Sequence, residues 1–406
     1  MNANRIIKVL IALFLLIYPW GTWFELNLFN IETNRGISTF LMILIVIIGI
    51  LNGNFTRGLR LYNKIQYLII FIVLCTLGTL ISGQFDSSFT IVSFITYFLL
   101  IFIILGLDLP LTQISNFVKT LFYSSCTMIL ISILDYHNII NIAGMNNSIF
   151  DSYDQNIGWI YDLTGPFNSR SHFANHLSLV VLLPVIYLAS EKNYFSIKSF
   201  FNIIALIMIY YAAIICHSRS LFISIFLTLI FYLFINRDFK SLKFLAGIIL
   251  VFLIGVNFNS ALFEAIFSRF GKFDISSDND GLRYLSFIQT LKSLLVNPIG
   301  YGFSPPYSEL LKDFKDVHSN ITYLFRAGGF IGVICLLVFF KPIIKKFIKL
   351  RINKREQFIY IPVLSFLIFG ISHTNITTTS FWLIIAFAFS LGLSPTTNKI
   401  NQNKSK

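Results

Sequence analysis

The chain has 406 residues, of which 56% are hydrophobic and only 12% are charged. Soluble domains carry about 25% charged residues, so this composition excludes a soluble protein and predicts an integral membrane protein. The formal net charge is +13. Cytoplasmic loops of membrane proteins collect Lys and Arg, and this explains the excess of basic residues without nucleic acid as a partner.

Apolar segments recur along the chain at the length that a membrane helix needs, about 20 residues. The first follows Arg5 and Lys8 and lacks a small-residue cleavage site, so we expect a retained helix and not a signal peptide. The sequence predicts an all-α, polytopic fold with about twelve transmembrane helices in a single membrane domain over residues 1–406. The predicted spans are 6–23, 37–52, 65–82, 89–107, 117–136, 172–190, 200–216, 219–235, 243–260, 318–340, 357–374 and 376–394.

The distribution of charge predicts the orientation of these spans. If the N-terminus is cytoplasmic and the spans alternate, most of the 31 Lys and Arg residues face the cytoplasm, and most of the 18 Asp and Glu residues lie outside. Such a bias is typical of membrane proteins. We therefore expect a multi-pass protein of the cytoplasmic membrane with both termini in the cytoplasm.

Neither cysteines nor carboxylates form a recognisable metal or disulfide pattern. The cysteines lie in or beside apolar runs without paired short spacing, at Cys75, Cys126, Cys216 and Cys335. Asp278 and Asp280 lie close together, but no Glu follows at the spacing of a calcium loop. We expect no metal or other cofactor.

Two predicted outer loops are long, over residues 137–171 and 261–317. Within the second, apolar residues at helical spacing predict an amphipathic helix over 282–295, with Leu285, Ile288, Leu291, Leu294 and Leu295 on one face. Asn297-Pro298 ends that helix, and Gly300-Tyr301-Gly302 with Pro305-Pro306 forces a turn. A second short helix is expected over 306–314. The Gly300 and Gly302 pair is too weak a signal for a phosphate loop.

Four polar patterns lie near the outer face, where ionisable residues beside a membrane are costly and so indicate function. Each also has a plainer interpretation. The first suits a helix cap formed by Asn168 or Ser171, and the fourth also suits a cap. The second suits an arginine that snorkels to headgroups, and the third suits the charged face of a surface helix. The patterns are 165–177 (GPFNSRSHFANHL), 217–220 (HSRS), 278–283 (DNDGLR) and 317–320 (VHSN).

Taken together, the patterns point to one chemistry. Guanidinium groups at the outer face suit a diphosphate, because their paired N–H donors match phosphate oxygens and neutralise developing charge. A histidine near them suits general-base work on a sugar hydroxyl. A diphosphate on a lipid is a good leaving group, so arginines are able to stabilise it without a metal. The combination indicates transfer of a glycan from a polyprenyl-diphosphate carrier.

The ordered set of motifs also resembles the O-antigen ligase and polymerase superfamily of bacterial envelope proteins. The motifs are GPFNSRSHFANHLSL, HSRSLFIS, GLRYLSFIQTLKSLLVNPIGYGF and VHSNITYLFRAGGFIGV, and they cover roughly residues 160–340. The resemblance implies a membrane-embedded glycosyltransferase of the C type. It implies an enzyme that uses undecaprenyl-diphosphate-linked glycans on the outer face of the cytoplasmic membrane, without a metal.

The resemblance also implies roles for individual residues. Arg219 and Arg283 match the arginines taken to bind the diphosphate, and His318 matches the histidine proposed as base or acceptor-positioning group. In the family the first motif more often reads N-x-N. This sequence departs from that pattern, which leaves the roles of Arg170 and His172 open. Further substrate contacts are expected from Asn168, Arg170, His172, Asn175, His217 and Asn320.

The expected function is polymerisation of lipid-linked repeat units into capsular, O-antigen or other envelope polysaccharide, with a chain-length regulator or flippase as an expected partner. A ligase that passes the glycan to another acceptor is the nearest alternative. A lipid-linked sugar transporter is disfavoured because no acidic residue lies deep inside a predicted span and no inverted repeat is visible. A non-catalytic assembly subunit of an envelope complex is the third alternative.

Overall fold

The computed structural model describes most of the predicted membrane region. The described residues are 3–20, 37–82, 88–140, 148–154, 158–167, 169–191, 196–236, 278–303, 319–348, 352–373, 376 and 378–393.

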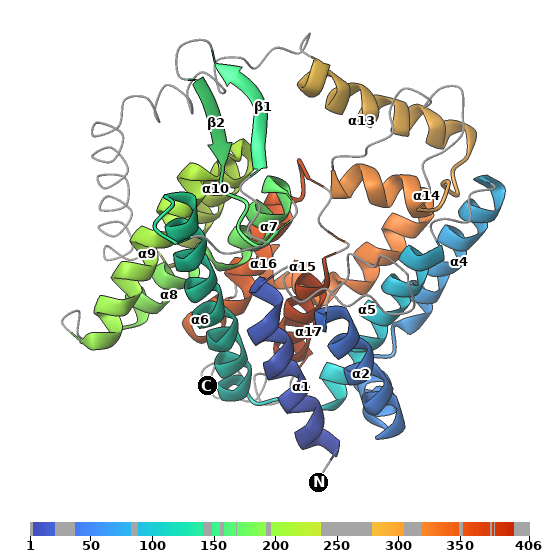
Figure 1. The fold of residues 1–406 in the computed structure, drawn as a ribbon. Helices are drawn as coiled ribbons and strands as arrows, with labels where there is room; N and C mark the ends of the chain where they lie inside the picture. The colour runs from blue at the N-terminus through green and yellow to red at the C-terminus, as the bar shows by residue number, and fades with distance from the viewer. Residues whose placement is uncertain are drawn as a thin grey trace.

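These residues form a bundle of helices with one small hairpin (Figure 1). The helices are α1 (Ala3–Ile17), α2 (Ile37–Leu51), α3 (Asn54–Leu61), α4 (Ile65–Ser82), α5 (Ser88–Gly106), α6 (Leu111–Tyr136), α7 (Arg170–Val180), α8 (Leu183–Ser190), α9 (Ile197–Ile215), α10 (Arg219–Asn236), α13 (Asp278–Val296), α14 (Asn320–Phe339), α15 (Lys341–Ile348), α16 (Gln357–Phe369) and α17 (Thr379–Leu393). A 3₁₀ turn covers Lys354–Glu356.

Among the described residues, seven helices are long and apolar enough to cross a membrane, or eight if the bent pair α2 and α3 is one span. This supports a polytopic membrane protein. Every predicted span falls on one or two of the helices above, except 243–260, which lies outside the described residues. The count of about twelve spans stays a prediction, because α16 and α17 are shorter than the length that a span needs.

Several helices of the bundle are bent or broken. The helices α2 and α3 meet at 80°, with Gly53 between them at a φ of 73°. The predicted span 172–190 is two helices, because α7 ends at Val180 and α8 begins with Pro184 in its first turn. The predicted span 318–340 contains non-helical backbone at Gly329. Breaks of this kind arise where proline or glycine interrupts the helical hydrogen bonds.

The loop over 137–171 contains a two-stranded antiparallel sheet that the all-helical prediction missed. Strand β1 (Ser148–Asp154) pairs with β2 (Gly158–Asp162), with an irregularity in the register between Ile149 and Tyr153. Aromatic residues and isoleucine, which favour strands, occur in both strands, which read SIFDSYD and GWIYD. The polar composition of the loop concealed that pattern.

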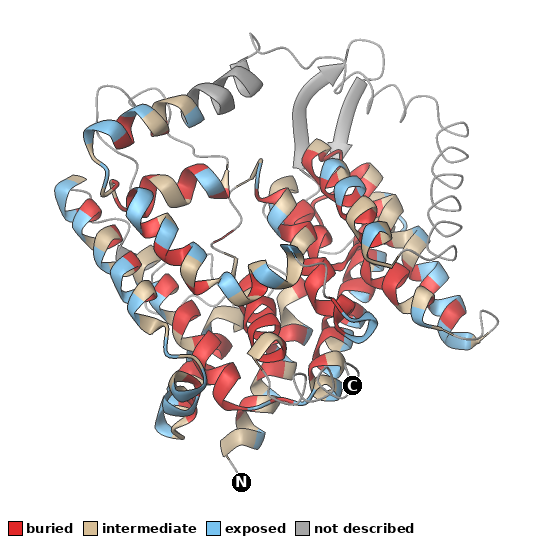
Figure 2. Cartoon of the chain, turned by 180° about the vertical axis from the view of Figure 1, so that it is seen from behind, coloured by how far each residue is buried: buried red, intermediate tan, exposed pale blue. Residues whose placement is uncertain are grey.

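The interior of the bundle is formed by α7, α8, α16 and α17. In the span Arg170–Ser190, 83% of the most apolar stretch is buried, against 28% for Ile65–Ser82. Figure 2 shows buried residues in the middle of the bundle and exposed ones along the peripheral helices. The exposed side chains there are largely apolar, for example Phe226 and Val92, as lipid contact requires.

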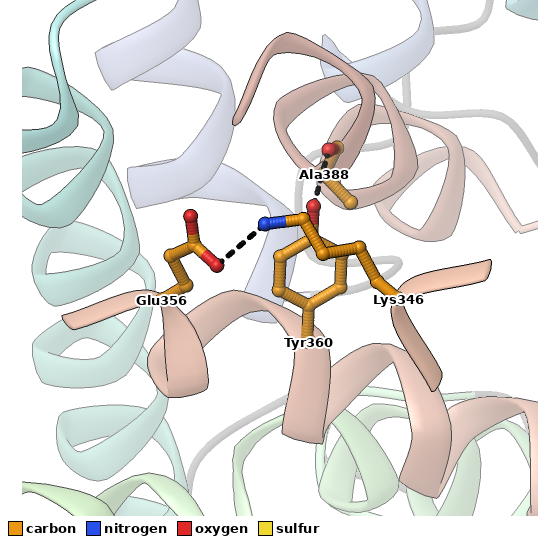
Figure 3. Close-up of polar contacts among 4 residues, drawn as sticks. All are labelled: Lys346, Glu356, Tyr360 and Ala388. Atoms are coloured by element: carbon orange, nitrogen blue, oxygen red, sulfur yellow. Dashed lines mark hydrogen bonds and ion pairs between the residues drawn. The ribbon is translucent and has the colours of Figure 1, made fainter. Parts of the chain in front are cut away.

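The end of the bundle at which α1 begins lies opposite the hairpin and α13 (Figure 1). We call the end beneath α13 and the hairpin the loop end. Toward the other end, Lys346 of α15 donates to Glu356 at 2.9 Å and its Nζ lies 5.6 Å from the centre of the Tyr360 ring (Figure 3). The Tyr360 hydroxyl donates to the Ala388 carbonyl at 2.9 Å and so ties α16 to α17.

We predict that Lys346→Met destabilises the protein by about 3 kcal/mol, because Glu356 is only 2% exposed and would be left as a buried charge without its partner. Lys345→Met on the same helix is the control, since Lys345 is exposed. The measurement is thermal unfolding in detergent. Equal shifts in the unfolding midpoint for the two variants would contradict the prediction.

Candidate functional site

The turn between α9 and α10 brings its polar residues against the start of α7. The amide of Leu163 donates to the Ile215 carbonyl at 3.1 Å. The Cys216 thiol donates to the Arg170 carbonyl at 3.7 Å. The two segments are therefore packed together at the loop end.

The predicted spans 200–216 and 219–235 leave room only for a tight turn at 216–219, and the structure has that turn between Ile215 and Arg219. His217 adopts a left-handed backbone with φ of 50°, which is uncommon for a residue with a side chain, and it is 7% exposed. Arg219 is the first residue of α10 and is half-buried. This geometry lets two membrane helices reverse direction within three residues and keeps an arginine at the start of the second.

The start of α7 is capped, and the cap is Ser169, not either of the two residues expected. Its hydroxyl accepts a hydrogen bond from the His172 amide at 3.3 Å. Arg170 is then the first helical residue and is half-buried, while His172 is exposed. Asn168 lies outside the described residues. Ser169 takes the cap position and one N–H group of the helix start, so the other polar residues of this run are not needed as caps.

Asn175 and Asn320 both hold the connection between α16 and α17. Asn175 Nδ2 donates to Thr378 Oγ1 at 2.8 Å. The side-chain oxygen Oδ1 of Asn320 accepts a hydrogen bond from the Ile376 backbone amide at 2.9 Å. The backbone amide of Asn320 donates to the Gly370 carbonyl at 2.8 Å. These contacts join α7 and α14 to one short connection. Whether the same asparagines contact a substrate, as the sequence predicts, stays a prediction.

His176 is a further polar residue in this region, and it is fully buried. Ser125 donates its hydroxyl proton to the Leu121 carbonyl at 2.6 Å. The Ser125 oxygen therefore accepts from His176 Nε2, 3.0 Å away, and Nδ1 is the unprotonated nitrogen. The rings of Phe167 and Tyr18 lie 5.5 and 5.7 Å from the imidazole. The spacing of four residues after His172 is the only signal of this position in the sequence, and it does not distinguish a packed histidine from a functional one.

Arg283 lies on α13, which begins at Asp278 and so extends the predicted helix by one turn at its start. The buried face of this helix differs from the predicted one. Thr290, Ser293 and Leu294 are at most 2% exposed, whereas Leu295 is 81% exposed. Residues three and four apart share a helix face, and Leu295 is turned away by its single-residue step from Leu294.

Several predictions fall on residues outside the described ranges. These are His318, Asn168, the span 243–260 and the short helix over 306–314. In the part of the chain that the structure describes, no group of three or more His, Cys, Asp and Glu residues is arranged to hold a metal ion.

Neither protein-family models nor curated proteins match this sequence. The functional conclusion therefore depends on the residues and their arrangement.

We predict that Asn320→Ala destabilises the protein by about 1–3 kcal/mol, because it leaves the buried Ile376 amide without its acceptor. Asn353→Ala serves as a control at an exposed asparagine. Chemical unfolding gives the free energy, and hydrogen exchange reports on the 370–378 connection. Unchanged exchange in that connection would show that the Asn320 side chain does not hold it.

Proposed function

We propose that this protein is a membrane glycosyltransferase. It moves a glycan from an undecaprenyl-diphosphate carrier onto the end of another lipid-linked repeat unit and so builds an envelope polysaccharide. The reaction takes place at the loop end, which faces the outside of the cytoplasmic membrane. The proposal names the polymerase reaction, and the ligase reaction is its nearest alternative.

The observation that carries this proposal is the packing of the α9–α10 turn against the start of α7. It places two arginines, Arg170 and Arg219, each at the first position of a helix, on adjoining segments. Helix starts attract anions because their free N–H groups and the helix dipole carry partial positive charge. Guanidinium groups add paired donors for phosphate oxygens. A lipid-linked diphosphate, whose tail lies in the membrane, fits such a site.

Two further features support a transfer reaction. The helix α13 runs across the loop end, toward the hairpin (Figure 1), and the backbone of Arg283 is in its first half. A cover of this kind limits the access of water, which competes with the acceptor hydroxyl in glycosyl transfer. His318 precedes Asn320 by two residues and is proposed as the base or acceptor-positioning group.

A transporter for lipid-linked sugars is the candidate of a different class. Such a protein would bind the same diphosphate, so binding alone does not separate the two. Turnover does, because a transporter leaves the glycan on its carrier.

We predict that Arg219→Ala, Arg283→Ala and His318→Ala each lower the rate of chain growth by about a hundredfold. The arginines are proposed to stabilise the leaving diphosphate, and His318 is proposed to act as the base or to position the acceptor. Purified protein is supplied with undecaprenyl-diphosphate-linked repeat units and EDTA, and products are separated on a gel. Arg57→Ala is the control, since Arg57 is an exposed arginine of α3.

The wild-type protein is expected to give a ladder of multiples of the repeat unit. Transfer only after a foreign acceptor is added would indicate the ligase. Full ladders from all three variants would overturn the assigned roles, and no transfer to any acceptor would favour the transporter or the assembly subunit.

A further inference from the structure

The helix α14 is interrupted in its middle by Gly329, whose φ and ψ are 64° and −168°. Figure 1 shows its first half beneath α13 and its second half descending in a different direction beside α4. A break of this kind removes helical donors from the carbonyls before it. Such groups are costly inside a membrane protein unless another part of the chain satisfies them.

A loop segment supplies the missing donors. The amide of Tyr301 donates to the Arg326 carbonyl at 2.7 Å, and the amide of Gly302 donates to the Ala327 carbonyl at 3.1 Å. The turn that presents these amides is shaped by Asn297, whose side chain donates to the Gly300 carbonyl at 2.8 Å. We call residues 297–303 the clasp.

The clasp is wedged between α14 and α4 at distances that only glycine allows. A Cβ on Gly302 would overlap Thr79 Oγ1 of α4 and lie 2.5 Å from the Thr79 amide nitrogen. A Cβ on Gly300 would lie 2.6 Å from the Gly329 amide nitrogen. Both glycines also have positive φ, 91° for Gly300 and 75° for Gly302. The backbone of the clasp therefore lies in direct contact with α4 on one side and with the backbone of α14 on the other.

An aromatic anchor completes the insertion. Phe303 is 5% exposed and stacks on Phe94 of α5 with ring centres 4.7 Å apart and planes at 14°. Its ring also lies 5.6 Å from Tyr323 in the first half of α14. The clasp thus contacts α4, α5, the first half of α14 and its break at Gly329, so it is a fixed part of the bundle.

The clasp follows α13 directly, since α13 ends at Val296. The Tyr301 hydroxyl donates back to the Ser293 carbonyl in the last turn of α13 at 3.2 Å. Arg283 precedes Asn297 by fourteen residues, which is about 21 Å along a helix. Figure 1 shows α13 above the first half of α14 at the loop end.

We propose that the clasp positions Arg283 for the reaction. It holds one end of α13 rigidly between α4 and α14, and the helix carries Arg283 across the loop end toward the starts of α7 and α10. Gly300, Gly302 and Asn297 are then positioning residues that act through Arg283. This inference rests on the proposed function, but the placement of α13 is measurable without any glycan substrate.

The test compares Gly302→Ala with Gly53→Ala. The two glycines have nearly equal φ, 75° and 73°, but a Cβ on Gly53 would meet no atom within 4 Å. Both substitutions place a side chain at a positive φ, and only Gly302→Ala forces the clasp away from α4. Asn297→Ala is a milder second variant that removes the hydrogen bond shaping the turn, in case Gly302→Ala does not fold.

Two measurements are made on full-length protein. Nitroxide labels at Lys292→Cys on α13 and Ile139→Cys after α6, both exposed positions, report the distance between α13 and the bundle. The described native cysteines are all buried, which favours labelling at the introduced ones. The rate of chain growth per folded protein is measured alone and in the Arg283→Ala background.

The expected result is a broadened distance distribution and a rate lowered by about tenfold or more in Gly302→Ala or Asn297→Ala, with Gly53→Ala unchanged. The loss should shrink in the Arg283→Ala background, because the two changes act through one group. An unchanged distance distribution, an unchanged rate, or a loss of the same size in both backgrounds would overturn the inference. If the wild type shows no transfer at all, the proposed function fails, and the distance measurement alone decides whether the clasp places α13.

Discussion

The need to satisfy every backbone polar group within the bilayer shapes the loop end of this protein. Helix α14 breaks at Gly329, and two of its carbonyls accept hydrogen bonds from Tyr301 and Gly302 instead of from the helix itself. A loop that follows α13 is thereby drawn into the bundle. The break and the loop depend on each other, because neither would have paired backbone groups alone.

The same constraint governs the polar side chains at the centre of the bundle. The side chains of Asn175 and Asn320 form hydrogen bonds with the connection between α16 and α17. The Ser125 hydroxyl fixes which nitrogen of His176 carries the proton. Buried polar groups that are paired in this way make a region rigid. Arg170 and Arg219 lie at helix starts beside this rigid region, where both are half-buried.

Features of the fold that depend on neighbouring residues are predictable from the sequence, whereas features that depend on residues far apart in the chain are not. Apolar length alone predicts the membrane helices, and Cys216 to Arg219 between two apolar runs predicts a tight turn. The break at Gly329 was not predicted, because glycine is common in membrane helices and its effect here depends on Tyr301 and Gly302, which lie elsewhere in the chain. The buried face of α13 was misassigned for a related reason. Thr290 and Ser293 are buried and Leu295 is exposed, because the surface on which the helix packs selects the buried face.

The central claim is that the loop end binds a lipid diphosphate. The most direct measurement is an electron cryomicroscopy structure of the protein with undecaprenyl diphosphate. The account predicts density for the diphosphate at the starts of α7 and α10, in contact with Arg219 and beneath α13. A headgroup bound at the opposite end of the bundle, near the Lys346–Glu356 pair, would contradict it.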